Sequence, residues 1–301
     1  MVDPILTVAP ALVLLLVVEL LVIRHRHQGS SNKSLDKKDI STSLAIGLVN
    51  QATSVLKVGS GAAALLVAAS ITPFHLPSGN IGIWILTLIL ADLAYYGAHR
   101  AQHRIRILWA NHSIHHSSQH FNTSAGFRLP PLFFLTILNK AVYIPLALIG
   151  IPPPMILTAE LIILLYQFPI HTEQIRMLWR PIEFVFNTPS HHRVHHGSNK
   201  KYLDKNYGGI FIIWDRLFNS YAHEDEVAQF GLTKNVDTYN PIKVVLHELS
   251  AIAADVRGTP RWRDRLGYAF APPGWAPTAR SGEDGSNFSA SWTFASRVKK
   301  L

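Results

Sequence analysis

The stretch HRAQHRIRILWANHSIHH, residues 99–116, begins where the apolar run IGIWILTLILADLAYYGA (81–98) ends. His99 and His103 are spaced i, i+4 in this stretch. On a helix that spacing places both imidazoles on one face, close enough to share a metal ion. We therefore expect a helix that leaves an apolar environment and presents a metal-binding face at its end.

A second group follows in the same stretch, because His112, His115 and His116 give the spacing i, i+3, i+4 on one helical face. Nine residues separate His103 from His112, which corresponds to about 900° of rotation at 3.6 residues per turn. One straight helix would point the two groups in opposite directions. The helix is therefore predicted to bend or end between them.

The same spacing returns in PSHHRVHH, residues 189–196, as His192, His195 and His196, while His171 stands alone in FPIHTEQ. A lone histidine is more often a hydrogen-bonded core or surface residue than a metal ligand. We apply that interpretation to His75, His223 and His247. His25 and His27 lie in a basic run and are expected on a solvated face at the membrane interface. His120 and His191 lie beside the groups but out of register, and we expect them to support the ligands from behind or to lie at the surface.

Two metal ions are indicated, because eight or nine neutral imidazoles exceed what one ion binds. The chain has 16 histidines and no cysteine, so a disulfide framework and a thiolate site are both excluded. Imidazole suits iron, copper, zinc and nickel alike, and the type of ligand alone does not select the metal.

The composition is that of a membrane protein. Hydrophobic residues make up 48% of the 301 residues and charged residues 16%, and the mean hydropathy is +0.17. The net charge of +9 could suggest nucleic acid as a partner, but no nucleic-acid-binding pattern accompanies it. We expect no nucleic-acid partner.

Five apolar runs approach the roughly 20 residues that cross a bilayer. The first could be read as a signal peptide, but the basic cluster follows it and no small-residue cleavage site closes it, so we interpret it as a retained anchor. Asn139 and Lys140 interrupt the fourth run, and Lys140 is expected to reach the interface or to face the site. The runs are 4–23, 58–74, 81–98, 131–149 and 154–170.

The charges predict the topology. The basic segment from Arg24 to Lys38 is cytoplasmic by the positive-inside rule, and the turns 75–80 and 150–153 contain no Lys or Arg. Five spans then place the N-terminus outside and all dense histidine groups in a cytoplasmic helical cap. We predict an all-α, multi-pass protein of a bacterial inner membrane or the endoplasmic reticulum.

The chain divides into three predicted parts. Residues 1–40 form an anchor with a basic loop, and 41–257 form the membrane-embedded domain with the histidines. The remainder, 258–301, is rich in Pro, Ser, Gly and Arg and is expected to be irregular.

Taken together, HxxxH, HxxHH and a later HxxHH resemble the membrane fatty acid hydroxylase and sterol desaturase superfamily. DLAYYGAHRAQH, ANHSIHHSSQHFN, IHTE and TPSHHRVHHGSNKKYLDKNYGGIFIIWDRLF are most similar to its alkylglycerol monooxygenase-like and bacterial sterol desaturase members. The similarity covers about residues 85–225.

This resemblance implies a non-haem di-iron oxygenase that uses O2 to hydroxylate or desaturate a lipid such as a sterol, a fatty acyl chain or an ether lipid. An alternative is ether-lipid monooxygenation with a tetrahydropterin as reductant. The implied iron ligands are His99, His103, His112, His115, His116, His171, His192, His195 and His196.

Electrons must come from a separate donor, because no dinucleotide, flavin or fused haem-binding pattern is present. Within the resembled superfamily the donors are cytochrome b5, ferredoxin-type proteins or, for alkylglycerol monooxygenases, a tetrahydropterin. We therefore expect a separate electron-donor protein or a diffusible reductant as a partner, beside a lipid drawn from the bilayer.

Carboxylates near the imidazoles could accept their N–H groups and orient them. Asp92 lies two helical turns before His99, and Glu173 follows His171 by two residues, so both are candidates. Asp92 could equally be hydrogen-bonded within the helix bundle. Asp204, Asn206 and Asp215 follow the last histidine group, where loop or helix capping is an equal alternative.

Two other functional classes fit less well. A metal transporter would distribute ionisable residues through the depth of several spans, whereas these histidines collect at one end. A zinc-dependent membrane hydrolase would carry HExxH, which is absent from the sequence.

The topology makes a direct prediction. Reporter fusions placed after Arg24 and in the C-terminal tail should both report the cytoplasm, because the positive-inside rule applies to both segments. A tail on the side opposite to the loop after Arg24 would mean that one span is miscounted, namely the one interrupted by Asn139 and Lys140.

Overall fold

The computed structural model describes residues 4–26 and 35–277, and over these residues the fold is helical with no strand. Two isolated bridges, Phe186 with Phe211 and Gly197 with Phe230, are its β-type pairings in that part of the chain. The all-α prediction is confirmed. The helices are α1 (Pro4–Arg26), α2 (Lys37–Ala52), α3 (Ser54–Ile71), α4 (Ile81–Arg104), α5 (Arg106–His116), η1 (Thr123–Phe127), α6 (Phe133–Lys140), η2 (Ala141–Tyr143), α7 (Ile144–Leu148), α8 (Pro153–Gln167), α9 (Arg180–Val185), α10 (Pro189–His196), α11 (Ile213–Leu217), α12 (Pro241–Arg257) and α13 (Trp262–Phe270).

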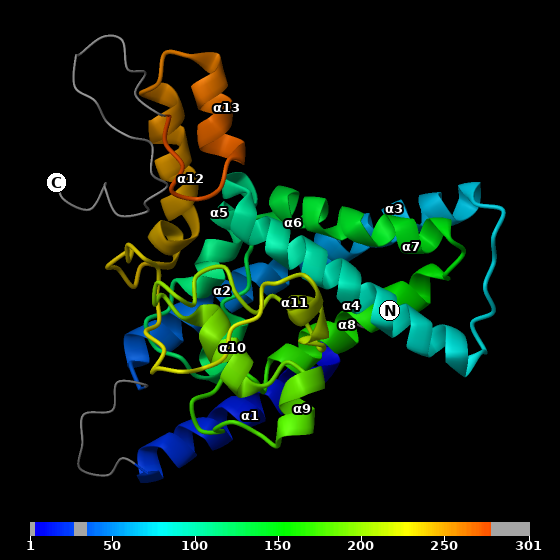
Figure 1. The fold of residues 1–301 in the computed structure, drawn as a ribbon, viewed down its shortest axis with the longest axis horizontal. Helices are drawn as coiled ribbons and strands as arrows, with labels where there is room; N and C mark the ends of the chain where they lie inside the picture. Colours follow the sequence, from blue (N-terminus) through cyan, green and yellow to red (C-terminus); the bar gives the residue numbers. More distant parts are fainter. Residues whose placement is uncertain (1–3, 27–34, 278–301) are drawn as a thin grey trace.

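The main apolar core lies between α3, α4, α7 and α8, which run side by side (Figure 1). Leu65 of α3, Ala91 of α4, Ala147 of α7 and Ile156 of α8 meet there, each 4% exposed or less. Small residues let the helix axes approach closely, as in membrane helix packing. The outer surfaces of α3 and α4 remain apolar and exposed, for example at Leu66.

Two of the five predicted spans, α3 and α4, are long and apolar enough to cross a bilayer. The last predicted span corresponds to α8, whose 15 residues give about 22 Å at 1.5 Å per residue, short of the roughly 30 Å hydrocarbon core. The fourth divides into α6, η2 and α7, because Pro145 lacks the N–H that would continue the helix. α1 has 23 residues, of which Pro4–Ala9 are described in backbone only.

Lys140 pairs with a carboxylate of a neighbouring helix. Its ammonium group lies 2.5 Å from the carboxylate of Glu160 on α8, and both side chains are largely buried. In this pair each charge compensates the other between apolar helices, where an isolated charge would be costly. The side chain of Asn139 lies outside the described residues.

The predicted break between the first two histidine groups is confirmed. α4 ends at Arg104, and Ile105 adopts an extended conformation (φ −123°, ψ 115°) before α5 begins. The chain thereby turns the histidines of α5 toward those of α4.

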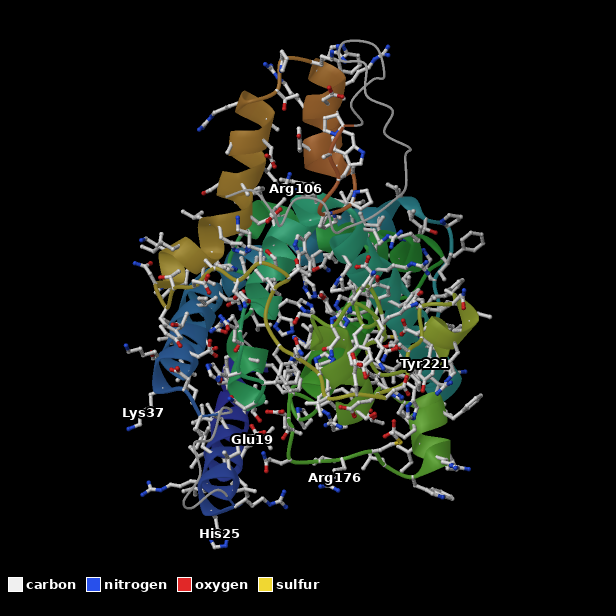
Figure 2. The ribbon with its side chains drawn as sticks, turned by 60° about the vertical axis from the view of Figure 1, so that its left-hand side comes forward. Glu19, His25, Lys37, Arg106, Arg176 and Tyr221 are labelled. Carbon is white, nitrogen blue, oxygen red and sulfur yellow. The ribbon has the colours of Figure 1, made fainter. Side chains whose placement is uncertain are left out.

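Glu19 joins α1 to the histidine-bearing part of the molecule (Figure 2). Its buried carboxylate accepts hydrogen bonds from the backbone N–H of Thr123, at 2.6 Å, and from the hydroxyl of Thr172. Thr172 directly follows His171. A carboxylate buried in an apolar helix is costly unless it is hydrogen-bonded in this way.

The fully buried Arg128 fixes α2 against the segment that follows α5. Its guanidinium lies 2.7 Å from the Asp39 carboxylate and donates to the hydroxyls of Ser43 and Ser117. α2 begins at Lys37, so the predicted domain boundary at residue 40 falls inside a helix.

At the other end of the chain, α12 and α13 form a hairpin that stands away from the body (Figure 1). Arg106 at the start of α5 lies at its base (Figure 2) and pairs at 2.7 Å with both Glu248 and Asp255 of α12. The segment 258–301 was predicted to be irregular, but residues Trp262–Phe270 form α13. The ring of Tyr268 on α13 packs against the ring of Trp275. Residues 278–301 lie outside the described residues.

Replacing Arg128 by Met is expected to destabilise the protein by about 3–5 kcal/mol, because Asp39 is left buried without its partner. The double variant R128M/D39N should lose less than R128M alone. Thermal unfolding of the detergent-solubilised protein measures both. Lys201→Met, which removes an exposed ion pair, is the matched control and should leave the midpoint unchanged. Equal losses in R128M and the double variant would contradict the role of the pair.

Candidate metal centre

The nine predicted ligands come from four places in the fold and meet in the interior. α4 supplies two, α5 three and α10 three, and His171 follows the end of α8. Each of the nine side chains is 8% exposed or less. The structure therefore brings together all nine histidines that the spacing and the family resemblance singled out.

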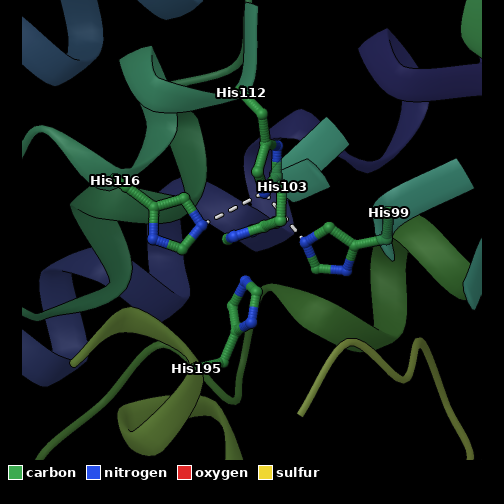
Figure 3. A group of neighbouring side chains, drawn as sticks. All are labelled: His99, His103, His112, His116 and His195. Atoms are coloured by element: carbon green, nitrogen blue, oxygen red, sulfur yellow. Dashed lines mark hydrogen bonds between the residues drawn. The ribbon is translucent and has the colours of Figure 1, made fainter. Parts of the chain in front are cut away.

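The first group contains His99, His103, His112, His116 and His195, which turn their rings toward one another (Figure 3). The Nε2 atom of His112 lies 2.8 Å from Nε2 of His99 and 3.1 Å from Nε2 of His116. One nitrogen from each ring falls within 4.8 Å of all the others in the group.

The second group contains His115, His171, His192 and His196, again with one nitrogen per ring within 4.8 Å of the rest. Nε2 of His171 lies 2.9 Å from Nε2 of His192 and 3.2 Å from Nε2 of His115. The two groups adjoin, since the rings of His116 and His196 stack with centroids 4.4 Å apart.

The division between the groups follows from helix geometry. In HxxHH, the residues at i and i+4 are about 40° apart around the helix, whereas i+3 lies about 60° to the other side of i. α5 accordingly gives His112 and His116 to the first group and His115 to the second. α10 does the reverse, giving His192 and His196 to the second group and His195 to the first. Each group thus depends on both helices.

The geometry of both groups fits metal ions. Two nitrogen ligands about 2.1 Å from one ion and about 90° apart are themselves about 3 Å apart, close to the observed spacings of facing Nε2 atoms. Nε2 atoms of His103, His195 and His196 are buried without a hydrogen-bond partner. Because buried polar nitrogens normally have partners, these three nitrogens are suited to bind a metal ion.

The imidazoles are in the form that binds metals. Burial lowers the pKa of His112, His116 and His196 well below its ordinary value, and the neighbouring imidazoles lower it further. Burial also lowers the pKa of His171 to about 4. A histidine with a lowered pKa stays neutral at physiological pH and keeps a lone pair available for an ion.

Backbone carbonyls, rather than carboxylates, orient several of these rings. Nδ1 of His99 lies 2.8 Å from the carbonyl oxygen of Tyr207, and Nδ1 of His171 lies 2.7 Å from that of Gln167. Nδ1 of His195 lies 3.0 Å from the carbonyl oxygen of Lys205. An Nδ1–H that donates to a carbonyl fixes the tautomer in which Nε2 faces the metal.

Of the two carboxylates predicted to orient imidazoles, Asp92 acts indirectly, through a loop. It accepts hydrogen bonds from the backbone N–H of Ile210 and Phe211 and from the indole of Trp214. It thereby anchors the loop that carries the Tyr207 carbonyl. Gly209 permits this approach, since a Cβ there would lie 2.5 Å from the Asp92 carboxylate. The side chain of Glu173 is exposed.

The same loop is held from its other side by residues whose role the sequence left open. Asp215 accepts hydrogen bonds from the backbone N–H of Tyr207 and Gly208, at 2.8 Å each. Asn206 adopts a left-handed conformation (φ 55°) and donates to the carbonyl of His191 on α10. A carboxylate oxygen of Asp204 lies 3.7 Å from Nδ1 of His103.

Histidines interpreted as bystanders lie outside both groups. His25 is at the outer end of α1 (Figure 2), and His75 and His223 are exposed. His191 pairs with Glu183 at 3.1 Å and forms the capping box of α10 with Thr188. The remaining described members of that set are His120 and His247, whereas His27 lies outside the described residues.

The crossed arrangement predicts a pattern of metal loss that spacing alone does not. His103→Ala and His195→Ala should remove the same ion, although they lie on different helices. The double variant H103A/H195A should therefore lose no more metal than either single variant, about one ion per chain. H103A/H192A should lose both ions, because its two changes affect different groups.

Metal content of the purified variants measures this, with His25→Ala as the matched control that keeps full content. Loss of both ions in H103A/H195A would contradict the crossed assignment, and so would retention of one ion in H103A/H192A.

The known proteins with related sequences are hydroxylases and monooxygenases by name. Residues 84–220 match the family model "Fatty acid hydroxylase". Alkylglycerol monooxygenase from Homo sapiens is 42% identical over 204 residues, covering 68% of this chain and 45% of that protein. The Caenorhabditis elegans alkylglycerol monooxygenase is 35% identical over 254 residues, covering 79% and 49%. Ornithine lipid hydroxylase OlsE from Rhizobium tropici is 31% identical over 140 residues, covering 46% and 41%.

The chain spans about half the length of the curated relatives it matches. No solved structure matches it. The matched segment contains all nine clustered histidines, in the order and spacing that suggested the superfamily. Through residues 84–220, the chain belongs to the fatty acid hydroxylase family.

Proposed function

We propose that this protein is a membrane-bound di-iron oxygenase that inserts an oxygen atom from O2 into a lipid. The observation that carries the proposal is the pair of adjoining groups of buried, neutral imidazoles, divided between five and four residues. Neither group holds a carboxylate. Family membership supports iron and O2 over a hydrolytic zinc site, which would also need a general base.

Two ferrous ions, when bound, supply electrons and an oxygen-activating centre capable of attacking an unactivated C–H bond. His99, His103, His112, His116 and His195 would hold one ion, and the other four histidines the second. The chain's own contribution is positional. The carbonyls of Tyr207, Gln167 and Lys205 orient their imidazoles, and the buried surroundings keep water away from the oxidant.

The substrate class that the relatives support best is an ether lipid of the alkylglycerol type. Oxygen insertion at the carbon beside the ether oxygen gives a hemiacetal, which breaks down to an aldehyde and a free alcohol. The similarity to an ornithine lipid hydroxylase supports a second candidate, hydroxylation of an amino-acid-containing lipid. In both cases the apolar exteriors of α3 and α4 suit a substrate that arrives from the bilayer.

The reaction needs two electrons from a separate donor, since one oxygen atom enters the lipid and the other leaves as water. Similarity to alkylglycerol monooxygenases favours a tetrahydropterin, and cytochrome b5 or a ferredoxin-type protein is the alternative. We place the site on the cytoplasmic side of a multi-pass membrane protein, with the N-terminus outward, where such reductants are available.

The test is conversion of a labelled alkylglycerol by the iron-loaded full chain in membranes, supplied with a tetrahydropterin under 18O2. We expect label from O2 in the released aldehyde or its hydrated form, analysed before exchange with water, and no more than one turnover per chain without reductant. His115→Ala should abolish conversion while the protein still inserts into membranes. His247→Ala, which changes a histidine outside both groups, should remain active.

Ornithine lipid and a fatty acyl lipid serve as parallel substrates, with a ferredoxin-type donor as the parallel reductant. A hydroxylated product from one of these alone would retain the oxygenase and replace the ether-lipid substrate. If no lipid gained oxygen from O2 in any combination, the oxygenase proposal would be wrong.

A further inference from the structure

The hairpin of α12 and α13 presents an apolar face that no part of the described chain covers. Trp262, Leu266 and Phe270 follow one another at intervals of four residues, so they lie along one side of α13. Their side chains are 64%, 49% and 58% exposed. The opposite side of α13 is buried, because Tyr268 packs against Trp275.

Positive charge surrounds this face. Residues 257–270 contain four arginines and a single acid, Asp264. All four arginines, Arg257, Arg261, Arg263 and Arg265, are exposed. Large apolar side chains on one face with arginines beside them are the composition of helices that lie in the plane of an anionic membrane surface.

The placement of the hairpin agrees with that composition. α12 and α13 run across the direction of α3 and α4 rather than along it (Figure 1). If α3 and α4 cross the bilayer, a helix lying across them runs parallel to the membrane surface. An acidic protein partner would be attracted by the same arginines, but it would not require three large apolar side chains in a row.

We propose that α13 is an interfacial helix whose Trp262, Leu266 and Phe270 insert into the cytoplasmic surface of the bilayer, with its arginines on anionic lipid headgroups. This rests on the proposed membrane placement of α3 and α4.

The proposal gives the hairpin a role in positioning the histidine site. Arg106, the first residue of α5, pairs with Glu248 and Asp255 of α12, and its backbone N–H donates to the carbonyl of Ala271 just beyond α13. α5 carries three of the nine clustered histidines. A hairpin seated on the membrane therefore holds α5 at a fixed depth beside the bilayer from which a lipid enters.

Because the chain contains no cysteine, single cysteines can be introduced and labelled without background. The full chain is reconstituted in vesicles of phosphatidylcholine with phosphatidylglycerol and labelled with an environment-sensitive fluorophore at W262C, L266C or F270C. We expect a blue-shifted emission that a lipid-borne spin label quenches and aqueous iodide does not. V227C, on an exposed loop residue of the cap, should show the opposite pattern.

Charge is tested in the same vesicles. The variant R261Q/R263Q/R265Q should reduce quenching by the lipid-borne label at position 266. Removing phosphatidylglycerol should have the same effect on the labelled protein that keeps its arginines. Quenching that is equal with and without anionic lipid would overturn the headgroup part of the proposal.

L66C, on the exposed face of α3, separates this inference from the membrane proposal. If lipid quenches L66C but iodide quenches positions 262, 266 and 270 as it quenches V227C, the interfacial helix is wrong and the membrane protein stands. Protection of the three positions from both quenchers would mean that protein covers the face, which also overturns the proposal. If lipid fails to quench L66C, the membrane placement itself is wrong.

Discussion

The crossed contribution of two HxxHH helices is the constraint on which the rest of the structure depends. Because a helix turns by about 100° per residue, the histidine at i+3 points away from the pair at i and i+4. Two such helices that face each other can therefore complete two groups only if each sends its middle histidine, His115 or His195, to the other's group. The break at Ile105 and the short, Pro-initiated α10 serve that convergence.

Burying nine imidazoles without a carboxylate among them carries a cost that an ion would remove. Their nitrogens face one another at 2.8–3.2 Å, and several have no hydrogen-bond partner in the described part of the chain. Metal binding should therefore be coupled to local order at the ends of α4, α5 and α10. The hydrogen bond between Glu19 and Thr172 and the ion pair between Arg128 and Asp39 connect the same region to α1 and α2. They limit how far this region can rearrange.

Spacing along the chain was enough to predict that eight of the nine histidines gather and that the first helix bends or ends between His103 and His112, because both follow from the helical period. His171, which stands alone in the sequence, came only from the family resemblance. Spacing was not enough to predict how the histidines divide, since that depends on how α5 and α10 face each other. The role of Asp92 could not be predicted either, because its hydrogen-bond partners lie 118 residues or more further along the sequence. Nor could hydropathy reveal that Lys140 finds Glu160, that Pro145 interrupts the fourth apolar run, or that Arg128 is a core residue.

The central claim is that two ions, each held by imidazoles from both α5 and α10, act together. Titration of the metal-free full chain with ferrous iron under anaerobic conditions, followed by a single turnover with O2 and lipid, tests it most directly. The account predicts that product forms in proportion to chains holding two ions, with about two equivalents needed for full yield and X-ray absorption showing imidazole nitrogen around the iron. Full product yield at one equivalent, or an iron environment dominated by carboxylate oxygen, would contradict it.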